Sequence, residues 1–600
     1  MIKTVNTKLI HSIFSDRLNV DKRYLLSLDS RALLQNYTLE AGVILENNQI
    51  TPDPSNTYLH WGWESPMCQL RGHFLGHWMS AASKIICFEG SRELDAKLKD
   101  IIDKLAEYQE LNGDGWVAPI PQKYMYILRQ KDRYIWSPQY TMHKFLMGLI
   151  DTYEYTGYSK ALEVFSGLAD WYVNWVKDNN EKCPEATYLG ETGGMLEIWA
   201  RAYILTGDKK YLDLAHEYDH PTLFDALNNG DDPLTDNHSN ASIPWSHGLC
   251  AMYIATGEDR YLKLAKKFWK CAVKDREAYA TNGQNAGEFW IGKGKLGEYM
   301  SDRNQEFCTV YNMVRLADYL FRFTGKTEYS DYIERCIYNG FLAQQNPNTG
   351  MPTYFLPMKS RSKKTWGSKT HDFWCCHGTM IQSPTLYHNL TFYYDKDNKQ
   401  IIISQFIPGK ATVEIDGVEC TIELNSDDKG SPVDTLFEET ADSKVSRWNF
   451  VLNVHCNSNT EFTLSVRIPD WASGSVEFKN DDNSPADGKT DEDGYYRLKR
   501  SWSEETFRFG FEAPLYLQPL PDRSDLAAVM EGPIVIASVG ESATLKDEPA
   551  KCLIPKTERV YQTIPWMQSH YFLPTKGADR DFIPLYEITD EEYSIYQKIK

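Results

Sequence analysis

A Thr-Gly dipeptide that returns at near-regular intervals is the feature that most constrains the fold. It begins at Thr156, Thr206, Thr256 and Thr324, each time after a run of apolar and aromatic residues. Glycine suits the left-handed conformation that ends a helix, so each dipeptide predicts a helix end. The first two intervals are 50 residues long and the last is 68. Helical hairpins that repeat at such a period stack side by side, and a circle of them closes into a toroid.

The repeat predicts an (α/α)6 toroid over residues 1–390, with helical spacing of apolar residues also at 24–39, 74–88 and 310–323. The longer last interval predicts a functional insertion on one face of that toroid. After residue 400 the chain changes to short, β-rich segments bounded by turns. They predict a β-sandwich over residues 391–540. Residues 541–600 are expected to be β-rich or part of a second sandwich, so the fold class is α + β and multidomain.

Charge and hydropathy exclude several classes of protein. The net charge of −19 argues against nucleic-acid binding, which needs basic patches. The N-terminus has no apolar segment of the signal-peptide type, and no apolar run is long enough to span a membrane. A cytoplasmic location is therefore expected, with no membrane partner. The 12 cysteines show no disulfide framework, which fits reduced thiols. The sequence leaves open whether the chain forms a homodimer.

Two adjacent cysteines, Cys375 and Cys376, precede a glycine and predict a turn that brings two sulfurs to one place. Three explanations compete: buried inert thiols, a disulfide between neighbours, and two thiolate ligands of a soft metal. Within the long interval, Glu306 and Cys308 stand at the start of a predicted helix, where both side chains can turn toward one ion. Taken alone, that pair also fits an ordinary structural role. Together the four residues supply three thiolates and a carboxylate, a set that favours Zn²⁺.

Several short motifs stand in an order that is typical of one family. They are Gly72-His73-Phe-Leu-Gly76-His77, His238-Ser-Asn-Ala-Ser-Ile-Pro244, Gly287-Glu288, Glu306-Phe307-Cys308, Tyr354-Phe-Leu-Pro357, Cys375-Cys376-His377-Gly378 and Arg467-Ile-Pro-Asp-Trp471-Ala. Through them the chain resembles the β-L-arabinofuranosidases of glycoside hydrolase family 127 and of its sister family 146 (the DUF1680 group). The resemblance covers most of the chain, and its specificity comes from the order and spacing of the motifs.

The resemblance implies a retaining mechanism with an unusual nucleophile. Cys375 would attack the anomeric carbon while bound to zinc, and Glu288 would act as acid and base. The zinc ligands would be Glu306, Cys308, Cys375 and Cys376. The resemblance places His143 where the family contacts the sugar and Tyr354 near the nucleophile. The other substrate-binding candidates are His73, His77 and His238, which are expected to line the mouth of the toroid, and Glu197, which is expected to bind hydroxyl groups.

Each binding candidate also has a structural alternative. The histidines can satisfy backbone carbonyl groups, and Glu197 and Glu64 can cap helices. Trp63 and Trp374 fit packing as well as a platform for a sugar ring.

The chain departs from the family beside the cysteine pair. Members commonly continue Cys-Cys-x-Gly-Thr with Gly-x-Glu, whereas this chain has Met380-Ile381-Gln382. The function predicted is a zinc-dependent retaining exo-glycosidase, a β-L-arabinofuranosidase acting on an oligosaccharide or glycoconjugate. Alternatives are a family member acting on a 3,6-anhydrogalactoside or a pectin side-chain sugar, a toroid epimerase or lyase, and a non-catalytic, zinc-stabilised sugar-binding protein.

Overall fold

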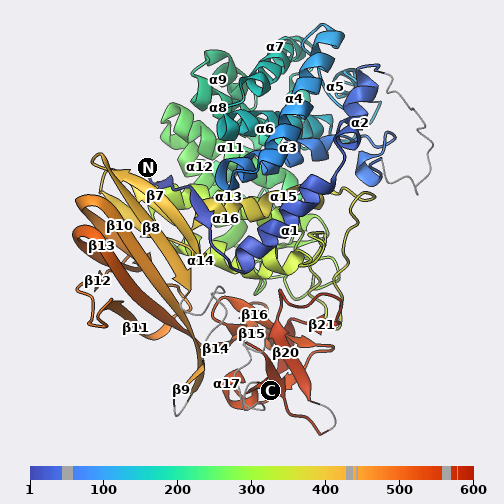
Figure 1. Ribbon diagram of the computed structural model, residues 1–600. Helices are drawn as coiled ribbons and strands as arrows, with labels where there is room; N and C mark the ends of the chain where they lie inside the picture. Colours follow the sequence, from blue (N-terminus) through green and yellow to red (C-terminus); the bar gives the residue numbers. More distant parts are fainter. Residues whose placement is uncertain (44–58, 131, 427–436, 441–442, 557–568, 577–578) are drawn as a thin grey trace.

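The computed structural model describes residues 1–43, 59–130, 132–426, 437–440, 443–556, 569–576 and 579–600 (Figure 1). Helices occupy the N-terminal part of the chain, and two sheets occupy the C-terminal part. This is the mixed helical and sheet multidomain class that the sequence predicted. None of the described helices combines the length and the apolar character that crossing a membrane requires.

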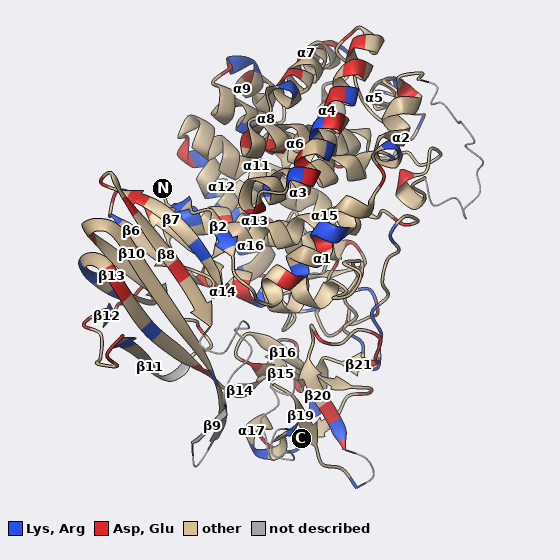
Figure 2. Ribbon diagram, in the orientation of Figure 1, with Lys and Arg blue, Asp and Glu red and all other residues tan. Residues whose placement is uncertain are grey.

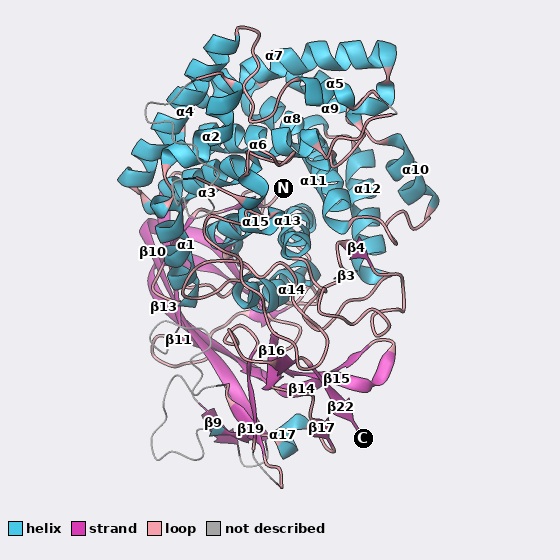
Figure 3. Cartoon of the chain, turned by 90° about the vertical axis from the view of Figure 1, so that its right-hand side faces the viewer, coloured by secondary structure: helices cyan, strands magenta, loops and turns pink. Residues whose placement is uncertain are grey.

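Six helices in the described part of the chain form a closed ring (Figure 3). Going around it, α3 contacts α6, α6 contacts α8, α8 contacts α11, α11 contacts α13, α13 contacts α15, and α15 returns to α3. The bounds are α3 (His73–Glu89), α6 (Pro138–Thr156), α8 (Gly193–Thr206), α11 (Ser239–Thr256), α13 (Phe307–Thr324) and α15 (Cys375–Gln382). The ring brings the N-termini of α13 and α15, which carry the cysteine motifs, to neighbouring positions.

A second helix packs on the outside of most ring helices. Thus α4 (Arg92–Asn112) contacts α3, α7 (Ser159–Lys182) contacts α6, α9 (Lys209–His216) contacts α8, α12 (Asp259–Trp269) contacts α11, and α14 (Thr327–Cys336) contacts α13. These helices are amphipathic, with acidic and basic residues mixed on their outer faces (Figure 2). The other helices are α1 (Ile13–Ser27), α2 (Ser30–Glu40), α5 (Lys123–Ile127), α10 (Pro221–Asn229), α16 (Tyr387–Leu390) and α17 (Pro549–Cys552).

The Thr-Gly dipeptides end helices as predicted. The four glycines adopt left-handed φ angles between 68° and 73°. Each preceding threonine hydroxyl donates to the carbonyl group four residues earlier, at 2.6 to 2.7 Å. The helical segment expected at 24–39 is instead two helices, because Asp29 caps the second one by accepting from the Arg31 backbone N–H at 2.7 Å.

The first sheet contains β5 to β13 together with two short strands from the N-terminus. Its central order is β1-β5-β6-β10-β8-β7-β2. The bounds are β1 (Lys3–Thr4), β2 (Thr7–Leu9), β5 (Phe392–Asp395), β6 (Gln400–Ile403), β7 (Gly409–Ile415), β8 (Val418–Ser426), β9 (Phe437–Thr440), β10 (Ser443–Arg467), β11 (Ser473–Asn480), β12 (Lys489–Thr490) and β13 (Tyr495–Ala513). The short strands thus tie the start of the chain to the sheet.

The second sheet begins at Leu515, in the order β17-β22-β15-β16-β20-β19-β18, with β14 on β15 and β21 on β16. The two sheets thus divide between Ala513 and Leu515, while the predicted domain limits at 390 and 540 stay predictions. The bounds are β14 (Leu515–Leu520), β15 (Arg523–Glu531), β16 (Ile534–Val539), β17 (Thr544–Leu545), β18 (Ile554–Pro555), β19 (Tyr571–Leu573), β20 (Arg580–Pro584), β21 (Tyr593–Ser594) and β22 (Tyr596–Ile599).

A buried charged cluster joins the first sheet to α14. Arg467, at the end of β10, is fully buried. Its guanidinium donates to Asp331 at 2.5 Å, to Glu334 at 2.7 Å and to the Ser404 carbonyl group at 2.7 Å. The Trp471 indole N–H donates to the other oxygen of Glu334 at 2.7 Å. The conspicuous Arg-Ile-Pro-Asp-Trp motif therefore holds the sheet against the hairpin of α13 and α14.

Candidate active site and metal centre

The four predicted metal ligands converge at the N-termini of α13 and α15. One ligand atom each from Glu306, Cys308, Cys375 and Cys376 lies within 4.8 Å of all the others. The Sγ atoms of Cys308 and Cys376 are 3.5 Å apart, and Cys375 Sγ is 3.6 Å from Glu306 Oε1. The neighbouring sulfurs of Cys375 and Cys376 are 3.9 Å apart and unbonded, so the pair is not a disulfide here.

Backbone geometry places these side chains. Gln305 and Phe373, just ahead of the two helix starts, have φ angles of 44° and 48°, which residues other than glycine seldom adopt. Strain of this kind collects at functional sites and is held there by surrounding structure. The Phe307 N–H donates to the Tyr354 carbonyl group at 3.0 Å, so the loop carrying Tyr354 is fixed to the start of α13.

The donor set fits a soft cation. Burial raises the pKa of all three cysteine thiols well above the ordinary value. Burial likewise raises the pKa of Glu306 to about 7. The second carboxylate oxygen of Glu306 is buried without a hydrogen-bond partner among the described residues. A cation would compensate the charge of thiolates and carboxylate and occupy this free oxygen, as in a closed sulfur-rich metal site.

Glu288 lies across from Cys375 on the turn between β3 (Asn285–Ala286) and β4 (Phe289–Trp290). The Tyr354 hydroxyl donates to Glu288 Oε1 and lies 3.4 Å from Cys375 Sγ, so one phenol bridges the two groups. The side chain of Asn285 donates to the Gly287 carbonyl group at 2.6 Å and accepts from the Glu306 backbone N–H at 3.2 Å. The turn with Glu288 is thereby tied directly to the segment that carries the predicted ligand Glu306.

His238 is paired with Glu288, with 3.5 Å between Nε2 and Oε2. The hydrogen bond from His238 lowers the pKa of Glu288, burial opposes this, and Tyr354 adds to the lowering. Burial lowers the pKa of His238, but Glu288 and neighbouring carboxylates outweigh it and raise that pKa to about 9. His238 also caps α11 by accepting from the Ala241 N–H at 3.0 Å. The structure thus places His238 beside Glu288 and at a helix end, a capping role that the sequence did not predict, and its contact with substrate stays a prediction.

Three of the predicted substrate-binding histidines are buried and have an unused ring nitrogen. The Nε2 atoms of His73, His77 and His143 have no hydrogen-bond partner among the described residues. The rings of His73 and His77 are 6.0 Å apart between centroids. The ring of His143 packs on Gly194 of α8, where a Cβ atom would come within 2.3 Å of it. Unpartnered buried nitrogens are costly unless a ligand uses them, which suits binding to hydroxyl groups.

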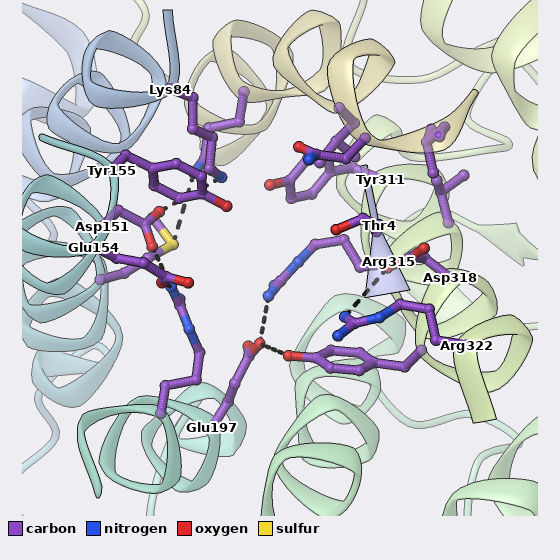
Figure 4. A pocket seen from close by; sticks show the side chains of 18 residues that line it. Thr4, Lys84, Asp151, Glu154, Tyr155, Glu197, Tyr311, Arg315, Asp318 and Arg322 are labelled. Carbon is purple, nitrogen blue, oxygen red and sulfur yellow. Dashed lines mark hydrogen bonds and ion pairs between the residues drawn. The ribbon is translucent and has the colours of Figure 1, made fainter. Parts of the chain in front are cut away.

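Two predicted residues have clear structural roles. Glu64 accepts from the backbone N–H groups of Gly72 at 2.7 Å and Phe74 at 2.9 Å, at the start of α3. Glu197 accepts from Arg315 at 2.5 Å and from the Tyr319 hydroxyl at 3.0 Å. It lines a charged cavity of about 170 Å³ inside the ring, whose lining residues include none of the four Glu/Cys ligands (Figure 4). Its proposed contact with substrate stays a prediction.

The tryptophans pack against other rings. Trp63 meets Trp136 edge to face at 5.1 Å, and Trp374 lies 5.5 Å from the Tyr354 ring. Trp374 therefore packs against the bridging phenol, while Trp63 forms an aromatic pair with Trp136 of the loop before α6.

Sequence reasoning missed two charged groups near the site. Lys144 is buried with its ammonium over the Tyr140 ring, and burial lowers its pKa to about 8 although the Cys308 charge opposes this. Burial raises the pKa of Glu191, and the nearby positive charges of His238 and Lys144 only partly offset this. Lys144 directly follows His143, so its position was a usable signal. Glu191 stands in a turn before α8, and no pattern in the sequence distinguishes it.

Comparison with known proteins places these features in one family. Residues 6–389 match the family model described as the β-L-arabinofuranosidase GH127 catalytic domain, and residues 400–507 match the GH127 middle domain. A curated non-reducing end β-L-arabinofuranosidase from Bifidobacterium longum subsp. longum is 24% identical over an alignment of 524 residues, and the match covers 76% of this chain and 74% of that protein.

Two solved structures share the fold over nearly the full length. One is a GH127 β-L-arabinofuranosidase from Geobacillus stearothermophilus T6, with a TM-score of 0.70 and 15% identity, covering 99% of this chain and 100% of that chain. The other is described as a GH127 β-arabinofuranosidase, with a TM-score of 0.73 and 16% identity, covering 100% of this chain and 98% of that chain.

Proposed function

This chain belongs to glycoside hydrolase family 127, and on that premise we propose that it is a zinc-dependent, retaining exo-β-L-arabinofuranosidase. The observation that carries the proposal is the bridge from Cys375 through the Tyr354 hydroxyl to Glu288. It sets a nucleophile and a proton-transfer group side by side, as a retaining glycosidase requires. A carbohydrate substrate follows from the family, and the arabinofuranose is inferred from the names of the relatives.

The chemistry is assigned to residues of this chain. Cys375 Sγ attacks the anomeric carbon and forms a carbon–sulfur bond while Glu288 gives its proton to the departing glycosidic oxygen. Glu288 then takes a proton from water, whose oxygen attacks the same carbon and releases the Cys375 thiolate. Two displacements at one carbon retain the configuration. A Zn²⁺ ion held by Glu306, Cys308, Cys375 and Cys376 would keep the thiols deprotonated and offset their charge.

Glu288 must carry a proton when the first step begins, although its pKa is lowered in the free protein. His238, 3.5 Å away, is the partner that can hold this proton, because its pKa is raised to about 9. A sugar that displaces water from the site disfavours the separated charges of His238 and Glu288. Binding would thus favour the neutral pair, with the proton on Glu288 and ready for the leaving oxygen.

The ring of paired helices supports one further part of the proposal. We infer that the hairpins form an (α/α)6 toroid, since each ring helix from α3 to α13 has an outer partner. The β-sandwich after the toroid stays a prediction. An epimerase or lyase on such a toroid would have no use for the Cys/Glu cluster. A family member with a different sugar remains the second candidate, because Gln382 stands where relatives commonly have a carboxylate.

One assay tests the proposal. Aryl glycosides of several sugars, including 4-nitrophenyl β-L-arabinofuranoside, are to be tested with metal content and product configuration measured on the same sample. We expect one zinc per chain and a β-L-arabinofuranose product of retained configuration. Full activity without metal, or a product of inverted configuration, would contradict the assigned mechanism. If only a glycoside of another sugar is hydrolysed, that sugar replaces L-arabinofuranose as the proposed substrate.

A further inference from the structure

Gln382, the last residue of α15, links the active-site histidines to the charged cavity inside the ring. Its side chain is buried, contacts α3 at His77 and Ser80, and lies 3.7 Å from Met147 Sδ of α6 through its amide nitrogen. Its Oε1 atom is 2.7 Å from His77 Nδ1, and its Nε2 donates to Ser80 Oγ at 2.5 Å. The Ser80 hydroxyl in turn donates to Asp151 Oδ2. A continuous hydrogen-bonded chain therefore runs from Asp151 to His77.

The direction of every bond in this chain follows from the ionisation of Asp151. Burial raises the pKa of Asp151, but Lys84 and Arg201 outweigh it and hold that pKa down at about 2. Arg201 donates to Asp151 Oδ1 at 2.6 Å, and the Lys84 ammonium is 3.5 Å from Oδ2. Figure 4 shows Lys84 and Asp151 on one side of the cavity. As a carboxylate, Asp151 can only accept, so the Ser80 proton points to it.

The remaining bonds then have only one arrangement. Since the Ser80 proton is engaged with Asp151, the Ser80 oxygen accepts from the Gln382 amide N–H. The carbonyl oxygen of Gln382 therefore faces His77, and His77 must donate from Nδ1. A neutral imidazole that carries its hydrogen on Nδ1 has a lone pair on Nε2. That Nε2 atom is buried and has no partner among the described residues.

The ring of His77 is also fixed in place next to the cysteine pair. It packs on Gly378, where a Cβ atom would lie 2.2 Å from the imidazole, and Gly378 is in the same helix turn as Cys375 and Cys376. On the other side the ring of His73 lies 6.0 Å away. Neither contact is a hydrogen bond to Nε2, so the lone pair stays free while the packing on Gly378 holds the ring in one orientation.

We propose that Asp151, Ser80 and Gln382 are positioning residues that lock His77 in its Nδ1–H tautomer, so that Nε2 accepts a hydrogen bond from a sugar hydroxyl group. The part that concerns sugar rests on the proposed function, whereas the tautomer does not. An amide suits position 382 because it has one donor end for Ser80 and one acceptor end for His77. A carboxylate there would compete with Asp151 for the single Ser80 proton.

The tautomer is to be measured on the free, metal-loaded enzyme. Protein labelled with ¹⁵N in its histidine rings, with a His77→Gln sample to assign the signal, reports which ring nitrogen of His77 is protonated. We expect Nδ1–H and an unprotonated Nε2 in the wild type. Gln382→Glu keeps an acceptor at His77 Nδ1 and should keep this signature. Gln382→Met removes the acceptor and should give mixed tautomers, and Ser80→Ala, which frees the amide to rotate, should do the same.

Kinetics with 4-nitrophenyl β-L-arabinofuranoside supply the second readout. Loss of one oriented neutral hydrogen bond predicts a fall of about three- to tenfold in kcat/KM for Gln382→Met, carried mainly by KM. Zinc content equal to the wild type shows that each variant is folded. A proton on Nε2 in the wild type, or an unchanged tautomer in Gln382→Met, overturns the proposal. If the enzyme does not hydrolyse this substrate but His77 shows the expected tautomer, the proposed sugar is wrong. The hydrogen-bonded chain from Asp151 to His77 is then still supported.

Discussion

Replacing Arg467 with methionine should destabilise the junction between the first sheet and α14 in a pH-dependent way. In the native protein the guanidinium pairs with Glu334, which is buried, and with Asp331, which is slightly exposed. Burial raises the pKa of Glu334, and Arg467 counteracts this. Without the arginine, Glu334 would be an unpaired buried charge and would take up a proton instead.

The cost can be worked from the proton that Glu334 must bind. A carboxyl group whose pKa is raised in the folded state contributes fully to the free energy of unfolding at pH values below its ordinary pKa of 4.5. This contribution is lost as the pH rises through the pKa of the folded state. Removing one partner of a buried ion pair costs about 3 to 5 kcal/mol, and near pH 7, where Glu334 and Asp331 must take up protons or stay charged without the arginine, the penalty should be of that size. Near pH 5 it should fall to about 1 kcal/mol, the remainder coming from lost hydrogen bonds.

Urea unfolding of the wild type and Arg467→Met at several pH values, with reversibility checked at each, measures this difference. The triple variant Arg467→Met/Glu334→Gln/Asp331→Asn is the matched control, since it removes both carboxyl groups that paired with the guanidinium and should lose most of the pH dependence. A destabilisation that is the same at every pH would refute the reasoning and would assign the loss to side-chain packing.

Three further changes act on the active site. Glu288→Gln should lower kcat/KM by about 10²- to 10⁴-fold for arabinosides with poor leaving groups and much less for acidic phenols, which a series of aryl substrates measures. Tyr354→Phe removes a donor that holds down the pKa of Glu288, so the alkaline limb of the kcat/KM profile should move to higher pH; an unmoved limb would contradict the bridge. Cys376→Ser should contain less zinc than the wild type, as measured by elemental analysis, and should recover part of its activity in excess zinc. Cys375→Ser should not recover activity in excess zinc.

The helical part of the fold and the Glu/Cys cluster could be predicted because both depend on local signals. The Thr-Gly caps need only glycine's left-handed conformation, and this occurs at all four positions. The cysteine pair and the Glu-x-Cys motif indicated one cluster because their donors suit the same ion. The structure brings them within bonding range of one centre, from two helices whose starts are 68 residues apart in sequence.

Other features could not be predicted because they depend on tertiary contacts. The strands β1 and β2 have two and three residues and carry no periodic pattern, yet they complete the first sheet by pairing with β5 and β7. The boundary between the sheets falls at Pro514, which cannot donate to a strand ladder, but prolines are too common in this chain to mark it. Glu191 reaches the site only through a turn.

The most direct test of the central claim is to identify the atom that bonds to the sugar. A cyclophellitol-type or haloacetamido analogue of L-arabinofuranose is incubated with the zinc-loaded enzyme, and the modified peptide is mapped by mass spectrometry. The mechanism predicts one label per chain, on Cys375, and none in Cys375→Ser. A label on Cys376 would exchange the roles of the two sulfurs. A label on a carboxylate would contradict the thiolate nucleophile and make the Glu/Cys cluster a structural metal site.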